Sequence, residues 1–314
     1  MTATPDKSGA LVSVADVVFD YDTVRALTDV SFEIEAGMVV ALVGPNGAGK
    51  TTLMRCICAL EQSSTGTIRV AGTEVRENPR EVHRNVGFLP DFFGLYDELT
   101  VEQSLLFHAG AKKLPRAEQR PQMLWAAAHL GISEQLDRRV GELSRGNRQK
   151  VAIAQAIIHK PRIALLDEPA SGLDPDARRQ LSQTIRALNR DGMTFIVSSH
   201  ILSELEDYSS HVLIVRDGRI DAFRPLGGES EARGATVTYR IVLSTPDIRL
   251  REMLAARADV DVLDADEVSV TCVIADSGED RQGLLRDLVM AGLPVVEFAD
   301  TRQSVSDVYF GGRE

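Results

Sequence analysis

The clearest chemical signal in the sequence is a glycine-rich loop that ends in a lysine and a threonine. Residues 44–51 read GPNGAGKT and match the spacing GxxxxGK[ST]. They follow an apolar run, Val39–Val43, and precede a helical pattern that begins at Thr52. In this context glycines let backbone N–H groups turn toward phosphate oxygens, and the helix N-terminus adds positive potential. The loop predicts a nucleoside triphosphate site in which Lys50 reaches the β- and γ-phosphates and Thr51 binds Mg²⁺. The candidate cofactor-binding residues of the loop are Gly44, Asn46, Gly47, Gly49, Lys50, Thr51 and Thr52.

Two adjacent carboxylates follow a second apolar run. Ile163–Leu166 predicts a short buried strand, and Asp167 and Glu168 come directly after it. Both would lie at the carboxyl end of the strand, the edge at which open α/β sheets bind ligands. There Asp167 can hold Mg²⁺, and Glu168 can orient or deprotonate an attacking water. A solvated loop after the strand is the alternative that this pair alone leaves open.

A third motif, LSRGNRQK, lies upstream of the carboxylates and opens an apolar helical pattern. By itself it predicts an ordinary N-capped helix. Together with the first two motifs, it resembles the ATP-binding cassette (ABC) ATPases, whose signature is Leu-Ser-Gly-Gly-Gln. The chain keeps Leu143, Ser144 and Gly146 of this signature and has Arg145 and Asn147 at the other two positions.

The resemblance covers residues 11–220 and implies roles for further residues. It implies that Tyr21 stacks on adenine, that His200 is catalytic and senses the γ-phosphate, and that SGLD at 171–174 is the loop after the carboxylates. It also implies that two chains sandwich two ATP molecules. Ser144 and Gly146 of one chain would then contact the ATP bound by the other.

One departure from the family concerns the magnesium site. The family usually has a glutamine that joins this site to the membrane partner, and here the residue is Asp91. A carboxylate accepts hydrogen bonds and binds Mg²⁺ but cannot donate as an amide does, so Asp91 joins Thr51 and Asp167 as a candidate metal ligand. The surrounding run LPDFFGLY resembles a multidrug or antibiotic exporter subgroup with separate membrane subunits. In that subgroup an acidic C-terminal domain often ends in a segment similar to SVSDVYF at 304–310.

Apolar patterning predicts the elements that must position these motifs. Short apolar runs alternate with helical patterns up to about residue 220, which favours a parallel α/β sheet. The alternating segment 30–35 predicts an antiparallel strand, and Asp217-Gly218 predicts a hairpin turn. Over about residues 91–155 the sequence has helical patterns without apolar strand runs between them, which predicts a helical insertion.

A turn-rich, polar stretch at 224–231 predicts a linker between two domains. The predicted domains are a nucleotide-binding domain, 1–226, and an accessory or regulatory domain, 227–314. Elements in the second follow the order β-α-β-β-α-β, which is ferredoxin-like. The expected fold class is therefore α/β: a P-loop ABC ATPase core with an antiparallel β subdomain and the helical insertion, plus a C-terminal α+β ferredoxin-like domain.

Composition limits the function classes. The chain has 314 residues, 44% of them apolar, which excludes a disordered or fibrous protein. The net charge is −11, so the chain lacks the excess of basic residues that is typical of a nucleic-acid binder. Residues 221–314 carry 18 acidic and 10 basic side chains, and residues 1–220 carry 28 and 25. No run approaches the ~18 to 20 apolar residues of a membrane span, and no signal peptide is evident. Three cysteines are too few and too scattered for a disulfide framework or a metal site. These features predict a soluble, cytoplasmic protein.

The expected function is the ATP-binding and ATP-hydrolysing subunit of an ABC exporter, with ATP and Mg²⁺ as cofactors. Such a subunit would work as a homodimer or heterodimer, lie on the inner face of the cell membrane through membrane-spanning partners, and bind no nucleic acid. One alternative is a soluble ABC ATPase that acts on ribosomes or DNA; the single cassette, the acidity and the lack of heptads count against it. The other is an ATP-gated regulatory protein that barely hydrolyses, which only Asp91 favours.

Overall fold

The computed structural model describes residues 9–199, 201–226, 236–257, 260–275 and 278–300, together with Val305 and Tyr309. The chain divides into two compact units, Met1–Arg224 and Pro225–Glu314. Each unit contains an apolar cluster of its own. Within the described ranges, none of the helices combines the length and the apolar character that a membrane span requires.

Long antiparallel strands begin the first unit. β1 (Ala10–Tyr21) and β2 (Val24–Glu35) pair with each other, and β4 (Thr65–Val70) and β5 (Thr73–Glu74) extend the sheet in the order β2-β1-β4-β5. Burial alternates along β2, because one face of the sheet covers the core and the other is exposed. The antiparallel strand predicted at 30–35 is thereby confirmed.

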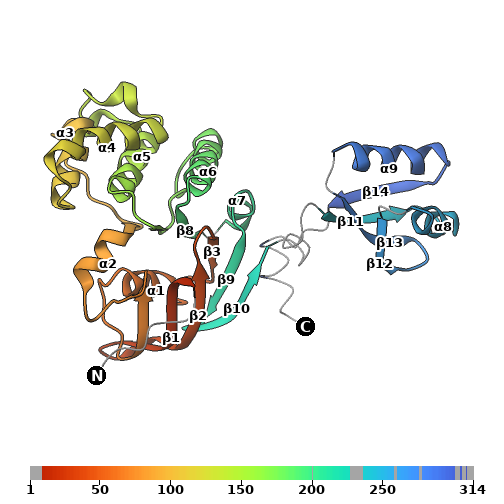
Figure 1. Ribbon diagram of the computed structural model, residues 1–314, viewed down its shortest axis with the longest axis horizontal. Coiled ribbons are helices and arrows are strands. Elements are labelled where there is room, and N and C mark those ends of the chain that lie inside the picture. The colour runs from red at the N-terminus through yellow and green to blue at the C-terminus, as the bar shows by residue number, and fades with distance from the viewer. Residues whose placement is uncertain are drawn as a thin grey trace. The chain divides into compact units, whose positions relative to one another are not determined.

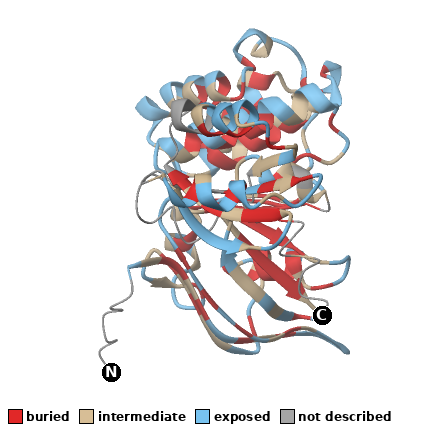
Figure 2. Ribbon diagram, turned by 90° about the vertical axis from the view of Figure 1, so that its right-hand side faces the viewer, coloured by how far each residue is buried: buried red, intermediate tan, exposed pale blue. Residues whose placement is uncertain are grey.

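A second, largely parallel sheet forms the centre of this unit. Its strand order is β10-β9-β3-β8-β7-β6. The strands are β3 (Val39–Val43), β6 (Val86–Leu89), β7 (Ile163–Leu166), β8 (Thr194–Ser198), β9 (His211–Arg216) and β10 (Arg219–Pro225). β3 pairs parallel with β8 and β9, and β7 pairs parallel with β6 and β8. β3, β7 and β8 are buried along their whole length, as their continuous apolar runs predict, and Figure 2 shows such buried strands in red.

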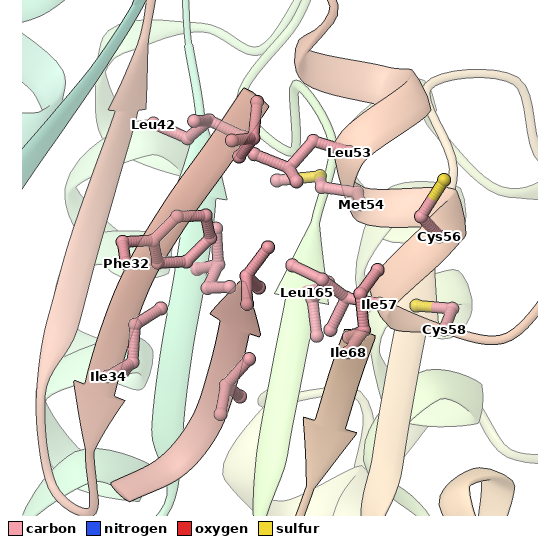
Figure 3. Packing of buried hydrophobic residues seen from close by; sticks show 14 of the residues in the cluster. Phe32, Ile34, Leu42, Leu53, Met54, Cys56, Ile57, Cys58, Ile68 and Leu165 are labelled. Carbon is pink, nitrogen blue, oxygen red and sulfur yellow. The ribbon is translucent and has the colours of Figure 1, made fainter. Parts of the chain in front are cut away.

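Helices cover this sheet and extend from it. They are α1 (Lys50–Ile57), α2 (Pro79–Asn85), α3 (Val101–Ala111), α4 (Arg116–His129), α5 (Arg145–Ile157), α6 (Pro175–Arg190) and α7 (Leu202–Glu206), with 3-10 turns at Ser133–Gln135 and Val140–Glu142. Leu53, Met54 and Ile57 point from α1 toward the strands (Figure 3), where they are fully buried. α3, α4 and α5 follow β6 and precede β7 in the sequence, and the three helices pack against one another. Figure 1 shows them grouped away from β1 and β2. Thr100 and Gln103 form the expected capping box of α3.

Two local predictions are wrong. α1 begins at Lys50 rather than Thr52, because Gly49 adopts the left-handed region and caps the helix two residues earlier. The predicted linker also starts too soon, since Pro225 lies inside β10. β10 is an edge strand, where a proline without an N–H costs no ladder hydrogen bond. The hairpin before it is confirmed: Asp217 and Gly218 have φ of 48° and 73°.

The second unit is a small antiparallel sheet with two helices. Its elements are β11 (Thr236–Leu243), α8 (Arg249–Ala255), β12 (Val260–Ala265), β13 (Ser269–Ala275), α9 (Gly278–Met290) and β14 (Val295–Asp300), which confirms the expected order of elements. The strand order is β12-β13-β11-β14. Ile241 and Cys272 of the sheet pack with Leu254 and Leu288 of the helices. Cys272 is free, as are Cys56 and Cys58, which agrees with the absence of a disulfide framework.

The separate cores predict that the first unit folds alone. A chain that ends at Leu226 should change the thermal midpoint of the first unit by less than about 4 °C, the shift that 1 kcal/mol produces in a domain of this size. It should also retain nucleotide binding. Calorimetry and titration with a fluorescent nucleotide measure the two quantities.

A chain that ends at Arg216 is the matched control. It removes Gly218, whose backbone bonds to Thr28 at 2.8 Å and to Ala48 at 3.1 Å hold the phosphate-loop region in place. This shorter chain should lose stability and binding together. Aggregation of the chain that ends at Leu226, or its loss of binding while folded, would contradict the independence of the first unit.

Candidate functional site

The predicted motifs meet at one edge of the parallel sheet. The loop 44–49 leaves β3, Asp91 follows β6, Asp167 and Glu168 follow β7, and β8 ends at Ser198. Because neighbouring parallel strands end at the same edge, these four segments come together although they are far apart in the sequence.

Close backbone packing shapes the glycine-rich loop. Gly49 has a φ of 106°, and a Cβ at this position would lie 2.7 Å from the carbonyl oxygen of Ala26 and 2.9 Å from Cδ2 of Leu27. A side chain is therefore excluded both by conformation and by space. This packing lets the loop turn directly into α1, whose first N–H groups are then available to an anion.

Lys50 is a buried cation at the start of α1. It is 8% exposed, and its Nζ donates to the carbonyl oxygens of Gly44 at 2.8 Å and Pro45 at 3.1 Å. Burial lowers the pKa of Lys50 below its usual value, while the nearby charges of Glu168 and Asp167 act in the opposite direction. Neither carbonyl neutralises the ammonium charge, so an anion beside Nζ would gain from this desolvated position.

Hydroxyl groups from two different elements hold the carboxylate of Asp167. Thr51 Oγ1 donates to Oδ2 at 2.7 Å, and Ser198 Oγ donates to Oδ1 at 2.6 Å. Asp167 is 2% exposed, and its own N–H donates to the carbonyl of Leu89. A carboxylate and a hydroxyl this close together are hard oxygen donors, and their chemistry fits Mg²⁺.

Glu168 lies next to this carboxylate in a strained backbone conformation. Its φ is 50°, which is uncommon for a residue other than glycine. Its N–H donates to Ser198 Oγ at 2.9 Å, so the same serine contacts both acidic residues. Sequence reasoning missed Ser198. Its only signal is a polar residue that ends the otherwise apolar run FIV.

A cavity of about 530 Å³ opens beside these groups, within the size range of small-molecule sites. The predicted residues that line it are Tyr21, Asn46, Gly47, Gly49, Lys50, Thr51, Thr52, Asp91, Asp167 and Glu168. The exposed Tyr21 accepts a hydrogen bond from Thr52 at 3.4 Å and packs edge-on against Phe19. Arg25 also lines the cavity, and sequence reasoning missed it as well.

Ser144 and Gly146 are not in this cavity. They line a separate hollow, also of about 530 Å³, between the start of α5 and the start of α6. Ser144 caps α5 and accepts the N–H of Asn147 at 3.3 Å, as the sequence predicts. The guanidinium of Arg145 lies against Gly172, where an added Cβ would overlap it. Two further predicted residues do not line the cavity that contains Lys50. Gly44 accepts a hydrogen bond from Lys50, and His200 lies outside the described residues.

Comparisons with known proteins agree with these motifs. Residues 27–171 match a protein family described as ABC transporter. The chain is 39% identical over 198 residues to the ABC transporter ATP-binding protein NatA of Bacillus subtilis, a match that covers 63% of this chain and 80% of NatA. It is 28% identical over 299 residues to the uncharacterized ABC transporter ATP-binding protein YxlF of the same organism, covering 95% and 98%. It is 31% identical to the spermidine/putrescine import ATP-binding protein PotA of Haemophilus influenzae, of which it spans 56%.

Solved structures give the same result. An ATP-binding subunit of an ABC transporter superimposes with a TM-score of 0.63 at 31% identity, covering 71% of this chain and 92% of that one. An ATP-binding cassette in a dimeric post-hydrolysis state, bound to ADP and Pi, also has a TM-score of 0.63 at 25% identity, covering 69% and 99%. The named relatives are transporter subunits, which favours transport over action on ribosomes or DNA. Because the match to NatA extends over four fifths of that protein, the chain belongs to the ABC transporter family, as an ATP-binding subunit that hydrolyses ATP to energise transport.

Proposed function

We propose that the chain powers an exporter of the multidrug or antibiotic type, through membrane-spanning subunits that are separate chains. The observation that carries the direction is the run at 89–96, which holds Asp91 at the usual glutamine position and resembles that subgroup. The match to YxlF also extends through the second unit, so an appended C-terminal region is common to both proteins. The similar segment at 304–310 lies outside the described residues, apart from Val305 and Tyr309. The complex would place the chain at the inner face of the cell membrane.

Isolation of the complex and a transport assay test this proposal. The chain should copurify from solubilised native membranes with a membrane-spanning subunit. In inside-out vesicles, ATP should drive the cargo of an exporter into the lumen. ATP-driven loss of cargo from the lumen would instead identify an importer, the direction in the name of PotA.

The cavity supports a division of roles for ATP hydrolysis. Lys50 would bind the β- and γ-phosphates, with the loop residues Gly44, Asn46, Gly47, Gly49 and Thr52 around them and Tyr21 against adenine. Thr51, Asp167 and Asp91 would hold Mg²⁺, which supplies charge neutralisation on the phosphates when bound. Glu168 would accept the proton of the attacking water. His200 keeps its proposed catalytic role on the sequence motif alone.

Electrostatics explain why this arrangement suits a reaction of phosphate. Phosphoryl transfer gathers negative charge on oxygens, and catalysis depends mainly on positioning and on opposing charge. Lys50 is desolvated and held by carbonyl groups, so its charge acts on the phosphates without prior reorganisation. The backbone N–H of Glu168 donates to Ser198 Oγ, and the residue lines the same cavity as Lys50 and Thr51.

The separate hollow supports a dimer. Ser144 and Gly146 open α5, a helix of 13 residues, and lie apart from the cavity that contains Lys50. A second chain would bring them to its own bound ATP, where a hydroxyl and free N–H groups meet phosphate oxygens. One chain carries both Glu168 and Ser144, so a homodimer would have two complete sites.

The second unit supports the ferredoxin-like interpretation. β13 lies between β11 and β12, and β11 lies between β13 and β14. Each β-α-β segment is therefore split by a strand of the other, which is the ferredoxin-like arrangement. We assign residues 1–226 to nucleotide binding, with the helical insertion at about 91–155, and residues 227–314 to an accessory domain that regulates or supports the dimer.

Glu168→Gln should separate binding from hydrolysis. An amide cannot accept the water's proton, so phosphate release should fall about 100-fold or more while nucleotide affinity remains. The variant should accumulate as an ATP-bound dimer in size-exclusion chromatography with Mg-ATP. Lys50→Ala should instead lose nucleotide binding, and Glu134→Gln, at an exposed glutamate on a 3-10 turn, is the matched control. A Glu168→Gln variant that binds nucleotide but stays monomeric would contradict the dimer.

Asp91 offers a second test of the site. If its carboxylate replaces the usual glutamine, Asp91→Gln should preserve turnover. Asp91→Ala removes an oxygen donor from the cavity wall and should raise the Mg²⁺ concentration for half-maximal turnover roughly tenfold. Titration of ATPase activity with Mg²⁺ measures this. Wild-type behaviour of both variants would make Asp91 a solvent-exposed loop residue with no part in the site.

A further inference from the structure

Ser198 contacts both of the adjacent acidic residues, Asp167 and Glu168. It is the last residue of β8 and is fully buried, with an exposed fraction of 0%. Its hydroxyl donates a hydrogen bond to Asp167 Oδ1 at 2.6 Å and accepts one from the Glu168 backbone N–H at 2.9 Å. One oxygen atom thus joins the two adjacent acidic residues.

Strand register explains how this contact arises. Val197 of β8 pairs with Leu166 of β7, so the next residue on each strand, Ser198 and Asp167, lie side by side at the end of the ladder. A parallel pair offers no ladder partner for the Glu168 N–H once β7 has ended. The serine oxygen accepts this N–H instead, at the residue whose φ is 50°. The hydroxyl therefore stabilises a backbone conformation that costs free energy by itself.

Asp167 has two side-chain donors, and they differ in what they can do. Thr51 lines the cavity and is a candidate metal ligand: its hydroxyl donates its proton to Oδ2 and has lone pairs that can bind a cation. Ser198 does not line the cavity, so it continues to donate its hydrogen bond to Oδ1 whether or not a cation is bound. It fixes the rotation of the carboxylate independently of the nucleotide.

We propose that Ser198 is a positioning residue for ATP hydrolysis, which sets the orientation of the Asp167 carboxylate and of the Glu168 backbone with a single hydroxyl. The proposal rests on the function and site roles proposed above. Ser198 contacts neither nucleotide nor water in this role. It acts through the two acidic residues, so its loss should affect turnover and the response to Mg²⁺ more than the affinity for ATP.

Ser198→Ala in the full-length chain tests the proposal. We expect kcat to fall about 10-fold to 100-fold, as when a partner that orients a metal ligand is removed, with KM for ATP close to that of wild type. The gain in affinity for mant-ATP on changing from EDTA to Mg²⁺ should shrink by a similar factor. This second measurement does not depend on turnover. Ser198→Thr keeps the hydroxyl and should recover most of both quantities.

Ser104→Ala is the matched control for stability. Ser104 is 1% exposed, and its hydroxyl accepts a hydrogen bond from Gln155 at 2.9 Å within the helical region, outside the cavity. It should lower the thermal midpoint as Ser198→Ala does but keep kcat and the Mg²⁺ response. Should Ser198→Ala fail to fold, Ser198→Cys, which keeps the volume and weakens the donor, decides the same question.

Two results would overturn the proposal. One is a folded Ser198→Ala or Ser198→Cys variant with wild-type kcat and Mg²⁺ response. The other is a loss of kcat that Ser104→Ala reproduces at an equal loss of thermal midpoint. An inactive wild-type chain would count against the proposed function, and the mant-ATP measurement would then still decide the role of Ser198.

Discussion

Parallel pairing of β3, β8 and β7 is the constraint on which the site depends. It places the ends of these strands at one edge, so that a hydroxyl from α1 and another from β8 reach the same carboxylate. The aligned strands are fully buried, and a slip in register would move a polar residue into the apolar interior. The burial that stabilises the sheet therefore also fixes distances of 2.6 and 2.7 Å between groups far apart in the sequence.

Much of this site follows from sequence, because its parts are local. A glycine-rich loop after an apolar strand, or two carboxylates after another, has a recognisable pattern within ten residues. Ser198 and Arg25 have no such local pattern. Ser198 belongs to the site because it contacts Asp167, which follows another strand, and Arg25 because it lines the cavity. The start of α1 was also beyond sequence reasoning, because the left-handed conformation of Gly49 depends on the close approach of Ala26 and Leu27.

The second unit shows the same division between local and distant information. In β11 and β13 every second residue lies in the core, a period of two that sequence reveals directly. The apolar residues Leu284, Leu285, Leu288 and Val289 indicate the second helix, but α9 begins before them, at Gly278. Its first turns carry few apolar residues, so hydrophobic periodicity could not find them. The strand order, by contrast, has no local signature, because it is decided by which faces of the strands bury together.

Backbone conformation at Gly172 limits how this protein can evolve. Its φ of 68° lies in the left-handed region, which costs most other residues roughly 1 to 2 kcal/mol. The guanidinium of Arg145 lies close by, but it ends a flexible, exposed side chain that can move aside. Substitutions at residue 172 are therefore restricted by the backbone rather than by this contact, and we expect descendants of this chain to keep glycine there or to change it to asparagine, which tolerates this conformation best.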